Sequence, residues 1–457
     1  SIESSNMTNL NVDFVNNFAI DIAPRDKVGD TYVINNIVGT NGGTLNISDF
    51  NFVGLAPIDR NIKLQVFDAN SISDVDFTAT DKKIFTPIGN YHLLSQGGGA
   101  YTASLADYNP QVFRGQVATM AAYNHQLLVD DMLTNHFILP NERLIDSAAL
   151  ANKSAIVDAV SPYQHTLEEG GMWTKSYVSF ETLSMTNNLN VNNNVYGTLV
   201  GADLPMVHLK NGWKVIPTAF LGYNGGNQRF NNVDMYQNGG QGGLMGTFIK
   251  NNFIGSIAAY AGGYVNEMNV AGYTDQAGNW FAGTAAKAAY NIHATKNFII
   301  QPTAFVAYNI FGKQNWGTDY GVMSMNSGLL NGVNVAPGLN LIYSKDTWSV
   351  YGTMQYMYNI NDQVGGEAGN VNLASVKMKH GYVNYGVGFT KTWKDRLSSF
   401  FQINLRNGGR TGVGFQLGFN YFFDWGNFGK KQPKLLENTQ QENIKPVKTV
   451  IKSLPKK

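Results

Sequence analysis

The sequence of 457 residues contains no cysteine and few charged side chains. Without cysteine no disulfide can form, and this suits a chain that crosses an oxidising compartment before it folds. Charged residues make up 14% of the chain, against roughly 25% in ordinary soluble domains. The formal net charge of +1 gives no argument for nucleic acid as a partner.

Long apolar segments are also missing. No run of 18 or more apolar residues occurs, so the sequence predicts no transmembrane helix. The first residues, SIESSNMTNL, lack an initiating Met and the basic and apolar parts of a signal peptide. We therefore expect this chain to be the carboxyl part of a longer precursor. If it spans a membrane, it must do so as a β-barrel.

Motifs for catalysis and for metal binding are absent as well. The seven histidines show no HExxH spacing, no GxSxG occurs, and the glycine cluster at 239–246 lacks the GK[ST] of a phosphate loop. We expect no enzyme activity, no cofactor and no metal centre. Asn359, Asn361, Asp362 and Glu367 could hold calcium in an outer loop, although an ordinary solvated loop is the favoured reading.

The most informative segment that is present is TGVGFQLGFNYFF, residues 411–423. Its residues alternate with a period of two, which predicts a strand with one apolar face. The apolar face consists of Val413, Phe415, Leu417, Phe419, Tyr421 and Phe423. Such a face packs against a core in a soluble sheet, or against lipid in a transmembrane barrel.

Two other parts of the chain precede the main strand region. Residues 1–109 contain short apolar bursts between Asn, Gly and Asp, which predicts stacked strands of a β-solenoid or a sandwich. In 111–137 the apolar residues recur at helical spacing, and about 26 residues would reach ~39 Å. We predict one long amphipathic helix there. A linker with a short helix near 146–160 is expected over 140–170.

From residue 171 onward the sequence predicts twelve strands. They cover 172–183, 191–206, 213–225, 235–250, 253–267, 276–292, 298–311, 332–344, 347–358, 380–392, 397–407 and 411–423. Every second connection is short and polar, whereas the intervening ones (184–190, 226–234, 268–275, 312–331 and 359–379) are mostly longer and more irregular. This sorting is typical of an outer-membrane barrel. Five aromatic residues near the strand ends would form its girdle: Trp173, Trp213, Trp348, Trp393 and Tyr421.

The polar faces of these strands would line the lumen of an all-β, 12-stranded antiparallel barrel. The lumen-lining residues expected are Gln301, Asn309, Asn334, Asn340, Gln402, Asn404, Arg406, Gln416 and Asn420. A barrel of this size has room for one helix or a narrow channel. On the predicted helix, Arg114, Asn124, Gln126, Asp130 and Asp131 would face the wall, as a packed plug or merely toward water. The glycines within 239–246 would let the helix approach the wall.

The order of stem, helix and barrel resembles a classical autotransporter of type V secretion. The resemblance is carried by GGGAYTASLADYNPQVFRGQVATMAAY (97–123), by GGMWTKSYVSF (170–180) and by the ending Tyr421-Phe422-Phe423. It implies that 1–109 is the carboxyl end of a β-helical, autochaperone-like passenger, that 110–170 holds the lumen helix and linker, and that 171–423 is the barrel. Strand 411–423 would be the insertion signal, with Phe415, Leu417, Phe419, Tyr421 and Phe423 facing lipid.

The resemblance also implies partners and a location. Expected partners are outer-membrane lipid, the barrel-insertion machinery, periplasmic chaperones and the upstream passenger, around a monomeric barrel with its amino-terminal part on the cell surface. Two features depart from the family. A lysine-rich segment, 424–457, follows the last strand; we expect a disordered periplasmic tail that is simply solvated or meets cell-wall polymers weakly. Asn124 and Asn135 are each unpaired, so self-cleavage at an Asn-Asn pair is not expected.

Three functions remain in competition at this point. The first is a non-enzymatic translocator that anchors and displays an upstream passenger. The second is a free-standing porin or adhesin barrel with a small surface domain. The third, an enzyme within 1–109, lacks catalytic groups. The helix favours the first, because a porin has no need of it before its first strand.

Overall fold

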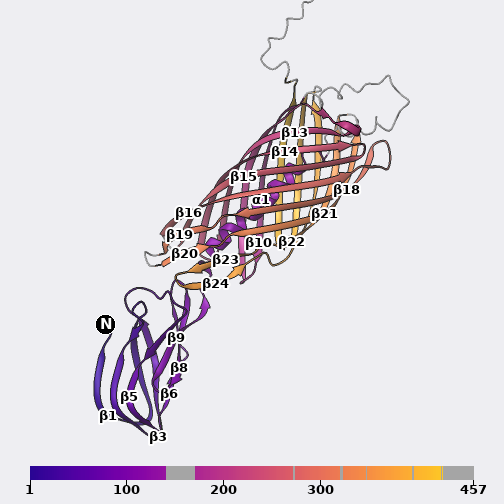
Figure 1. Cartoon of the computed structure of the whole chain (residues 1–457). Coiled ribbons are helices and arrows are strands. Elements are labelled where there is room, and N and C mark those ends of the chain that lie inside the picture. Colours follow the sequence, from indigo (N-terminus) through magenta and orange to yellow (C-terminus); the bar gives the residue numbers. More distant parts are fainter. Residues whose placement is uncertain are drawn as a thin grey trace, which may run out of the picture.

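The computed structural model describes residues 1–139, 170–270, 273–319, 323–345, 347–393, 396–423 and 425. A slender stem of strands leads into a wide barrel with a helix inside it (Figure 1). Within these ranges no helix is both long and apolar enough to cross a membrane. The predicted linker at 140–169 and the tail from 426 onward lie outside the described residues.

The stem begins with a parallel sheet of long strands. Two strands of 20 and 22 residues pair in parallel, β1 (Ser4–Ala23) and β3 (Thr31–Phe52). On its other side, β3 pairs in parallel with two short strands, β5 (Phe67–Ser73) and β6 (Asp76–Ala79). Equivalent asparagines bond between successive strands, as Asn36 Nδ2 does to Asn9 Oδ1 at 2.9 Å. Ile22, Ile34 and Ile37 are buried beneath them. This stacking confirms the solenoid-like stem.

An antiparallel sheet completes the stem next to the barrel. Its order is β4-β9-β8-β7, with bounds β4 (Asn61–Gln65), β7 (Lys83–Phe85), β8 (Gly89–Gly97) and β9 (Ala100–Tyr108). Directly after β9, the Asn109 side chain accepts the backbone N–H of Gln111 at 3.2 Å. This cap starts the 3-10 turn η1 (Pro110–Phe113), in which Pro110 needs no N–H partner. The helix α1 (Arg114–Thr134) follows.

Twelve antiparallel strands close into the barrel, which confirms the predicted fold class. The strands are β10 (Gly171–Met185), β11 (Leu189–Asp203), β13 (Lys214–Phe230), β14 (Val233–Lys250), β15 (Phe253–Val270), β16 (Tyr273–Tyr290), β18 (Phe298–Phe311), β21 (Leu330–Lys345), β22 (Trp348–Asn361), β25 (Tyr382–Trp393), β26 (Leu397–Gly408) and β27 (Arg410–Phe422). Each pairs with its neighbours, and β27 pairs with β10 in the register Phe422 to Gly171. No edge is therefore left open in this sheet of described strands.

The prediction that short and long connections alternate between the two ends of the barrel is only partly correct. At the stem end the strands run longer than expected, so that 184–190 and 226–234 shrink to tight turns. Asn187, Asn188 and Asn231 adopt positive φ in these turns, a conformation that Asn tolerates. At the other end, the expected minimal turn at 208–212 belongs to a longer projection that holds β12 (Val207–His208) and η2 (Lys210–Gly212). The short strand β17 (Ile292–His293) lies in another connection.

Two connections at the stem end are not irregular as predicted. Segments within 312–331 and 359–379 fold into a four-stranded antiparallel sheet, β19-β20-β23-β24, which we call the mouth sheet. Its bounds are β19 (Gln314–Asp319), β20 (Met323–Ser327), β23 (Val364–Ala368) and β24 (Val371–Val376). The prediction was wrong because the segments are too short and too rich in Asn, Gly and Ser to show alternation.

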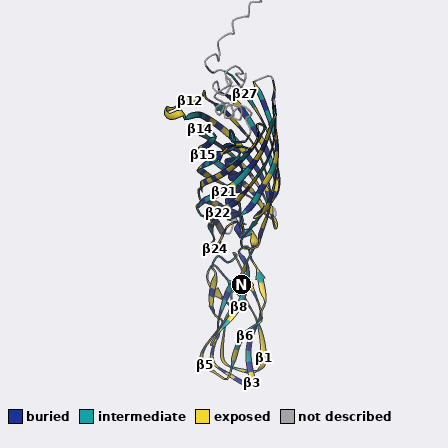
Figure 2. Cartoon of the chain, turned by 90° about the vertical axis from the view of Figure 1, so that its right-hand side faces the viewer, coloured by how far each residue is buried: buried dark blue, intermediate teal, exposed yellow. Residues whose placement is uncertain are grey.

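Outward and inward faces alternate along the barrel, as Figure 2 shows in its striped strands. The described alternation agrees with the predicted faces of 298–311, 332–344 and 411–423. One of the five aromatic residues predicted for the girdle does not face outward. Trp173 is only 4% exposed and its ring packs at a tilt against His136 inside the barrel, so it does not belong to the girdle. The position one residue earlier, Met172, faces outward at 52% exposure.

Candidate functional site: the helix inside the barrel

The helix α1 is enclosed on all sides by the barrel (Figure 1). All of its residues except Asp131 are buried, including Gln116, Asn124 and His125. Of the two alternatives for the polar residues of this helix, a packed plug or side chains that face water, this burial agrees with the packed plug. Because the barrel's inner wall is itself polar, polar side chains on every face of the helix find partners there.

Two of the predicted helix residues form one hydrogen-bonded group with the wall. Asn309 on β18 donates its Nδ2 to Asp130 Oδ2 at 2.8 Å. Gln126 donates its Nε2 to Asp130 Oδ1 at 2.9 Å and to Gln241 Oε1 on β14 at 3.0 Å. The buried carboxyl group of Asp130 is thus satisfied from both the helix and the wall.

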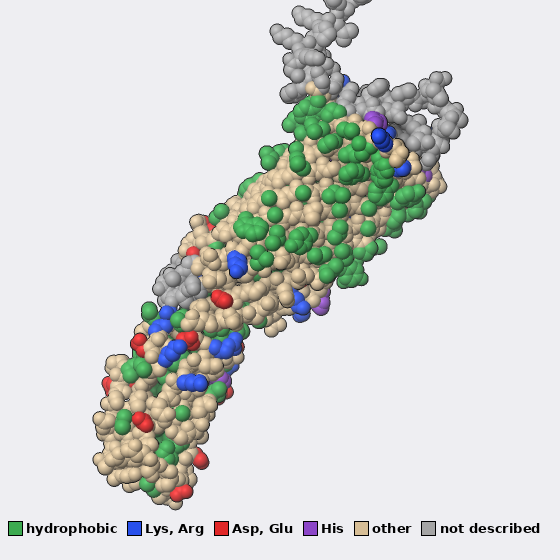
Figure 3. All heavy atoms as spheres, in the orientation of Figure 1, with side chains coloured by type: hydrophobic (Ala, Val, Ile, Leu, Met, Phe, Trp, Pro, Cys, Tyr) green, Lys and Arg blue, Asp and Glu red, His purple; other side chains and the backbone are tan. Residues whose placement is uncertain are grey.

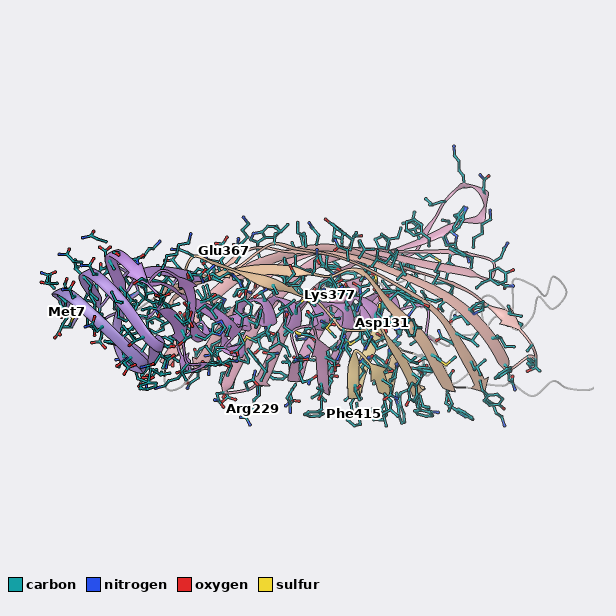
Figure 4. All side chains as sticks on the ribbon, turned by 90° about the horizontal axis from the view of Figure 1, so that it is seen from below. Met7, Asp131, Arg229, Glu367, Lys377 and Phe415 are labelled. Atoms are coloured by element: carbon teal, nitrogen blue, oxygen red, sulfur yellow. The ribbon has the colours of Figure 1, made fainter. Side chains whose placement is uncertain are left out.

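Ion pairs add charge-assisted contacts. Lys287 on β16 donates to Asp131 Oδ1 at 2.9 Å, which joins the helix to the wall directly. Figure 4 shows Asp131 inside the barrel, in contrast to Arg229, which points away from it. Asn124 donates its Nδ2 to Met378 Sδ at 3.3 Å, and its carbonyl accepts from Arg410 Nη1 at 2.9 Å. Arg114 stays near the mouth, where its Nη1 donates to the Gln111 carbonyl at 3.3 Å.

Arg410 is fixed by a buried carboxylate on the barrel's first strand. Its guanidinium binds Glu181 in a bidentate manner, with Nη2 to Oε1 at 2.7 Å and Nε to Oε2 at 2.9 Å, and both side chains are 0% exposed. Arg406 lies 3.5 Å from the same carboxylate and donates to Ser179 Oγ at 2.7 Å. Asn193 Nδ2 donates to Glu181 Oε1 at 2.9 Å. This network joins the first and last strands of the barrel beside the helix.

Other side chains of the wall donate hydrogen bonds to backbone carbonyls in and just after the helix. The sequence did not predict these bonds. Lys175 Nζ donates to the Met132 carbonyl at 3.0 Å, in the last turn of α1. Gln301 Nε2 donates to the Ile138 carbonyl at 3.0 Å, just beyond the helix. Gln237 Nε2 reaches the Ala118 carbonyl at 2.8 Å. No residue pattern in the helix could reveal these bonds, because every residue has a carbonyl.

The other lumen residues fall into two groups. On the side against which α1 packs, Asn334 accepts a hydrogen bond from Tyr123 of the helix, and Asn340 donates to Gln301 at 2.8 Å. Gln402, Asn404, Arg406, Gln416 and Asn420 lie on β26 and β27, and all but the half-buried Asn420 are buried. Of this second group, three residues line a cavity of about 40 Å³ beside the end of the helix: Gln402, Gln416 and Asn420. That volume holds a water molecule or two.

The mouth sheet closes over the start of the helix. Gln116 Nε2 donates to the Val364 carbonyl at 3.1 Å and to the Ala374 carbonyl at 2.8 Å. Trp316 lies so close to Gly115 that an added Cβ would be 2.8 Å from the indole nitrogen. On its outer side, the β23–β24 turn meets the stem, where Asn370 N donates to the Ile58 carbonyl at 2.9 Å. The mouth sheet therefore contacts both the helix and the stem.

The glycines at 239–246 do not act as predicted. A Cβ added at Gly239 would meet the ring of Tyr264, and one added at Gly243 would meet the ring of Phe220, so they make room for wall side chains. A barrel-wall glycine that does make room for the helix is Gly332 on β21, where an added Cβ would lie 2.2 Å from the Tyr123 hydroxyl. Spacing alone gave no signal for this single glycine.

The predicted insertion strand is β27, beside the first strand of the barrel. Leu417, Phe419 and Tyr421 are exposed on its outer face, and Phe415 and Phe423 are half-buried. The possible calcium ligands do not share one environment, since Asn361 and Glu367 are exposed and Asn359 is half-buried. Asp362 is buried and accepts the N–H of Met378 at 3.3 Å. The described residues hold no group of three or more His, Cys, Asp or Glu suited to a metal ion.

This chain is similar to a known protein family and to several solved structures. The family model "Autotransporter beta-domain" matches residues 172–404. Among solved structures, the beta domain of the Bordetella autotransporter BrkA has 14% identity and a TM-score of 0.46, over 56% of this chain and 100% of that chain. The transport unit of Escherichia coli AIDA-I has 13% identity and a TM-score of 0.46, over 62% and 98%.

The translocator domain of Neisseria meningitidis NalP has 11% identity and a TM-score of 0.46, over 62% of this chain and 94% of that chain. No curated protein sequence matches the chain. The family model spans just over half of the chain, and its match begins in β10 and ends within β26. The chain belongs to the autotransporter beta-domain family.

Proposed function

We propose that this protein is a non-enzymatic translocator that anchors an upstream passenger in the outer membrane and displays it on the cell surface. One observation carries the proposal. The polypeptide leaves the stem at one end of the barrel, runs through the lumen as α1, and starts the first barrel strand, β10, from the opposite end. Any segment joined to the stem is thereby tethered through the barrel.

The proposal includes an orientation for the two ends of the barrel. The end with the mouth sheet and the stem is assigned to the cell surface, and the end with residues 208–212 and the start of β10 to the periplasm. In this orientation β27 finishes at the periplasmic rim, where its exposed Leu417, Phe419 and Tyr421 would be read by the insertion machinery and by chaperones. The lysine-rich segment 424–457 would extend into the periplasm.

The packed helix argues against an open porin. Hydrogen bonds and an ion pair join α1 to β14, β16, β18 and β27, and the mouth sheet covers its first turn. A porin interior of this width would instead be water-filled. In the display function, the helix occupies the lumen after the passenger has passed through it, and it stays there as a plug.

Conductance in planar bilayers tests the plug. Deleting residues 111–137 should raise the single-channel conductance clearly above that of the whole chain, because the lumen loses its packed helix. Deleting residues 1–105 is the matched control: it removes most of the stem but leaves α1 and its wall contacts, so the conductance should stay low. Equal conductance of all three proteins would contradict the plug.

Epitope accessibility tests display and orientation. The β8–β9 turn at Gly97–Gly99 suits an inserted tag, because Gly98 is exposed and has open space around its Cα. Antibody should bind this tag on intact cells, and should bind a tag after residue 457 only once the outer membrane is permeabilised. A stem tag that stays hidden until permeabilisation would refute surface display, whatever the conductance.

A further inference from the structure

The outer wall of the barrel contains an apolar groove near its periplasmic rim. The groove has a volume of about 570 Å³ and crosses β14, β15, β16 and β18. Its lining includes Trp213, Phe248, Phe253, Ile257, Ala288 and Val306. Figure 3 shows apolar side chains gathered over the half of the barrel far from the stem. A volume of this size is typical of ligand pockets.

A positive charge lies at the end of this groove. Lys250 Nζ sits 5.4 Å from the centre of the Trp213 ring, and this ring packs edge-on against Phe253 at 5.9 Å. None of the ion pairs between described residues includes Lys250. The segments 204–214 and 248–257 contain no Asp or Glu. The site thus combines apolar walls with an ammonium group that has no carboxylate partner in these ion pairs or segments.

The neighbouring connection projects beyond the barrel wall at the same rim. It carries β12, which Figure 2 shows outside the outline of the barrel. Leu204, Val207 and Leu209 are 46% to 49% exposed on it, and Lys210 is exposed near its tip. Exposed apolar residues interleaved with lysine are typical of segments that lie in the interfacial layer of a membrane.

We propose that this groove binds a glycerophospholipid from the periplasmic leaflet of the outer membrane, which we call the inner leaflet. One acyl chain lies along the apolar walls, and the phosphate lies at Lys250. The surface is continuous with the lipid-facing wall, so a lipid reaches the groove without leaving the bilayer. Lys210 adds a second positive charge at the headgroup level, and Leu204, Val207 and Leu209 extend the apolar contact. Basic residues beside an apolar transmembrane surface favour anionic headgroups. The assignment to the inner leaflet rests on the orientation proposed above.

Native mass spectrometry of the detergent-purified whole chain tests the proposal, with phosphatidylglycerol as the added lipid. The wild-type protein should retain one phosphatidylglycerol molecule. Lys250→Gln, which removes the charge, and Ala288→Phe, which fills the groove, should each lower its retention about fivefold or more.

Two variants serve as matched controls. Lys391→Gln removes another rim lysine that lies over a tryptophan, at 5.7 Å from the Trp393 ring, and Ala219→Phe enlarges an exposed wall residue outside the groove lining. Both should retain lipid as the wild type does. Heat-modifiable gel migration shows that every variant has a folded barrel.

Several results would overturn the site. Equal retention by all four variants would do so, as would retention of a diacylglycerol without phosphate as strongly as phosphatidylglycerol. Stronger retention of lipid A than of phosphatidylglycerol would assign the groove to the outer leaflet and refute the occupant. Surface display is measured separately by the tag in the stem, so a failed lipid site and a failed orientation can be told apart.

Discussion

Replacement of Glu181 should destabilise the barrel more than replacement of its partner Arg410. Glu181→Leu leaves both Arg406 and Arg410 buried in the lumen of this outer-membrane barrel without their carboxylate. After Arg410→Met, by contrast, the carboxylate keeps Arg406 at 3.5 Å and the amide of Asn193 at 2.9 Å. The two single variants therefore leave different numbers of buried charges without partners.

The size of the effect follows from the burial of the pair. Breaking a buried ion pair by removing one partner costs about 3–5 kcal/mol, because an uncompensated charge remains. We expect Glu181→Leu near the upper end of this range and Arg410→Met near the lower end. The double variant removes both charges of the 0% exposed pair, so its loss should be smaller than the sum of the two by about 2 kcal/mol or more.

Urea-induced unfolding of the barrel in phospholipid vesicles, followed by tryptophan fluorescence, gives the three free energies. Arg229→Gln is the control, because Arg229 forms an ion pair with Asp234 on the exposed outer side (Figure 4). Such exposed pairs contribute little, so its unfolding midpoint should hardly move. The coupling would be refuted if the double variant lost the sum of the two single losses to within about 0.5 kcal/mol. The role of burial would be refuted if Arg229→Gln shifted the unfolding midpoint as far as Glu181→Leu does.

Three further variants test the helix and the mouth. Gly115→Leu should force the mouth sheet away from the helix, so trypsin should cleave faster than in the wild type at Lys313 and Lys377, which flank that sheet. Asp131→Asn leaves the buried Lys287 ammonium without its carboxylate and should lower the free energy of unfolding by about 3 kcal/mol in the same urea assay. Asn370→Ala removes a bond to Asp59, 3.0 Å long; amide hydrogen exchange in the β23–β24 turn should speed up, with no change in the barrel strands.

The barrel was predictable because each strand faces two different environments. Lipid on one side and a polar lumen on the other impose a period of two that survives in a single sequence. The strand 298–311 was predicted to the residue, with Gln301 and Asn309 on its inner face. The helix was predicted for a similar reason, and its place in the lumen came from the family resemblance. A period of 3.6 reports a helix, but it does not report what covers the polar side.

The partners across the lumen could not be predicted. Glu181 and Arg410 are 229 residues apart in sequence, and only closure of β27 onto β10 brings them together. Trp173 was misplaced for a related reason, since one step along a strand reverses the face, and the small residues around it gave no alternation to fix the parity. The mouth sheet forms only when two separate connections meet over the helix, so neither of them shows a sheet by itself.

The end of the helix shows how the wall, more than the helix sequence, determines where the plug stops. The last carbonyls of any helix lack partners within it, and a buried helix end therefore needs donors from elsewhere. Lys175 supplies one to Met132, and its positive charge also lies at the negative end of the helix dipole. Gln301 then holds the Ile138 carbonyl one turn further on. Because these bonds use backbone atoms, helices of different sequence could be stopped at the same depth, whereas loss of the wall donors would leave carbonyls buried without partners.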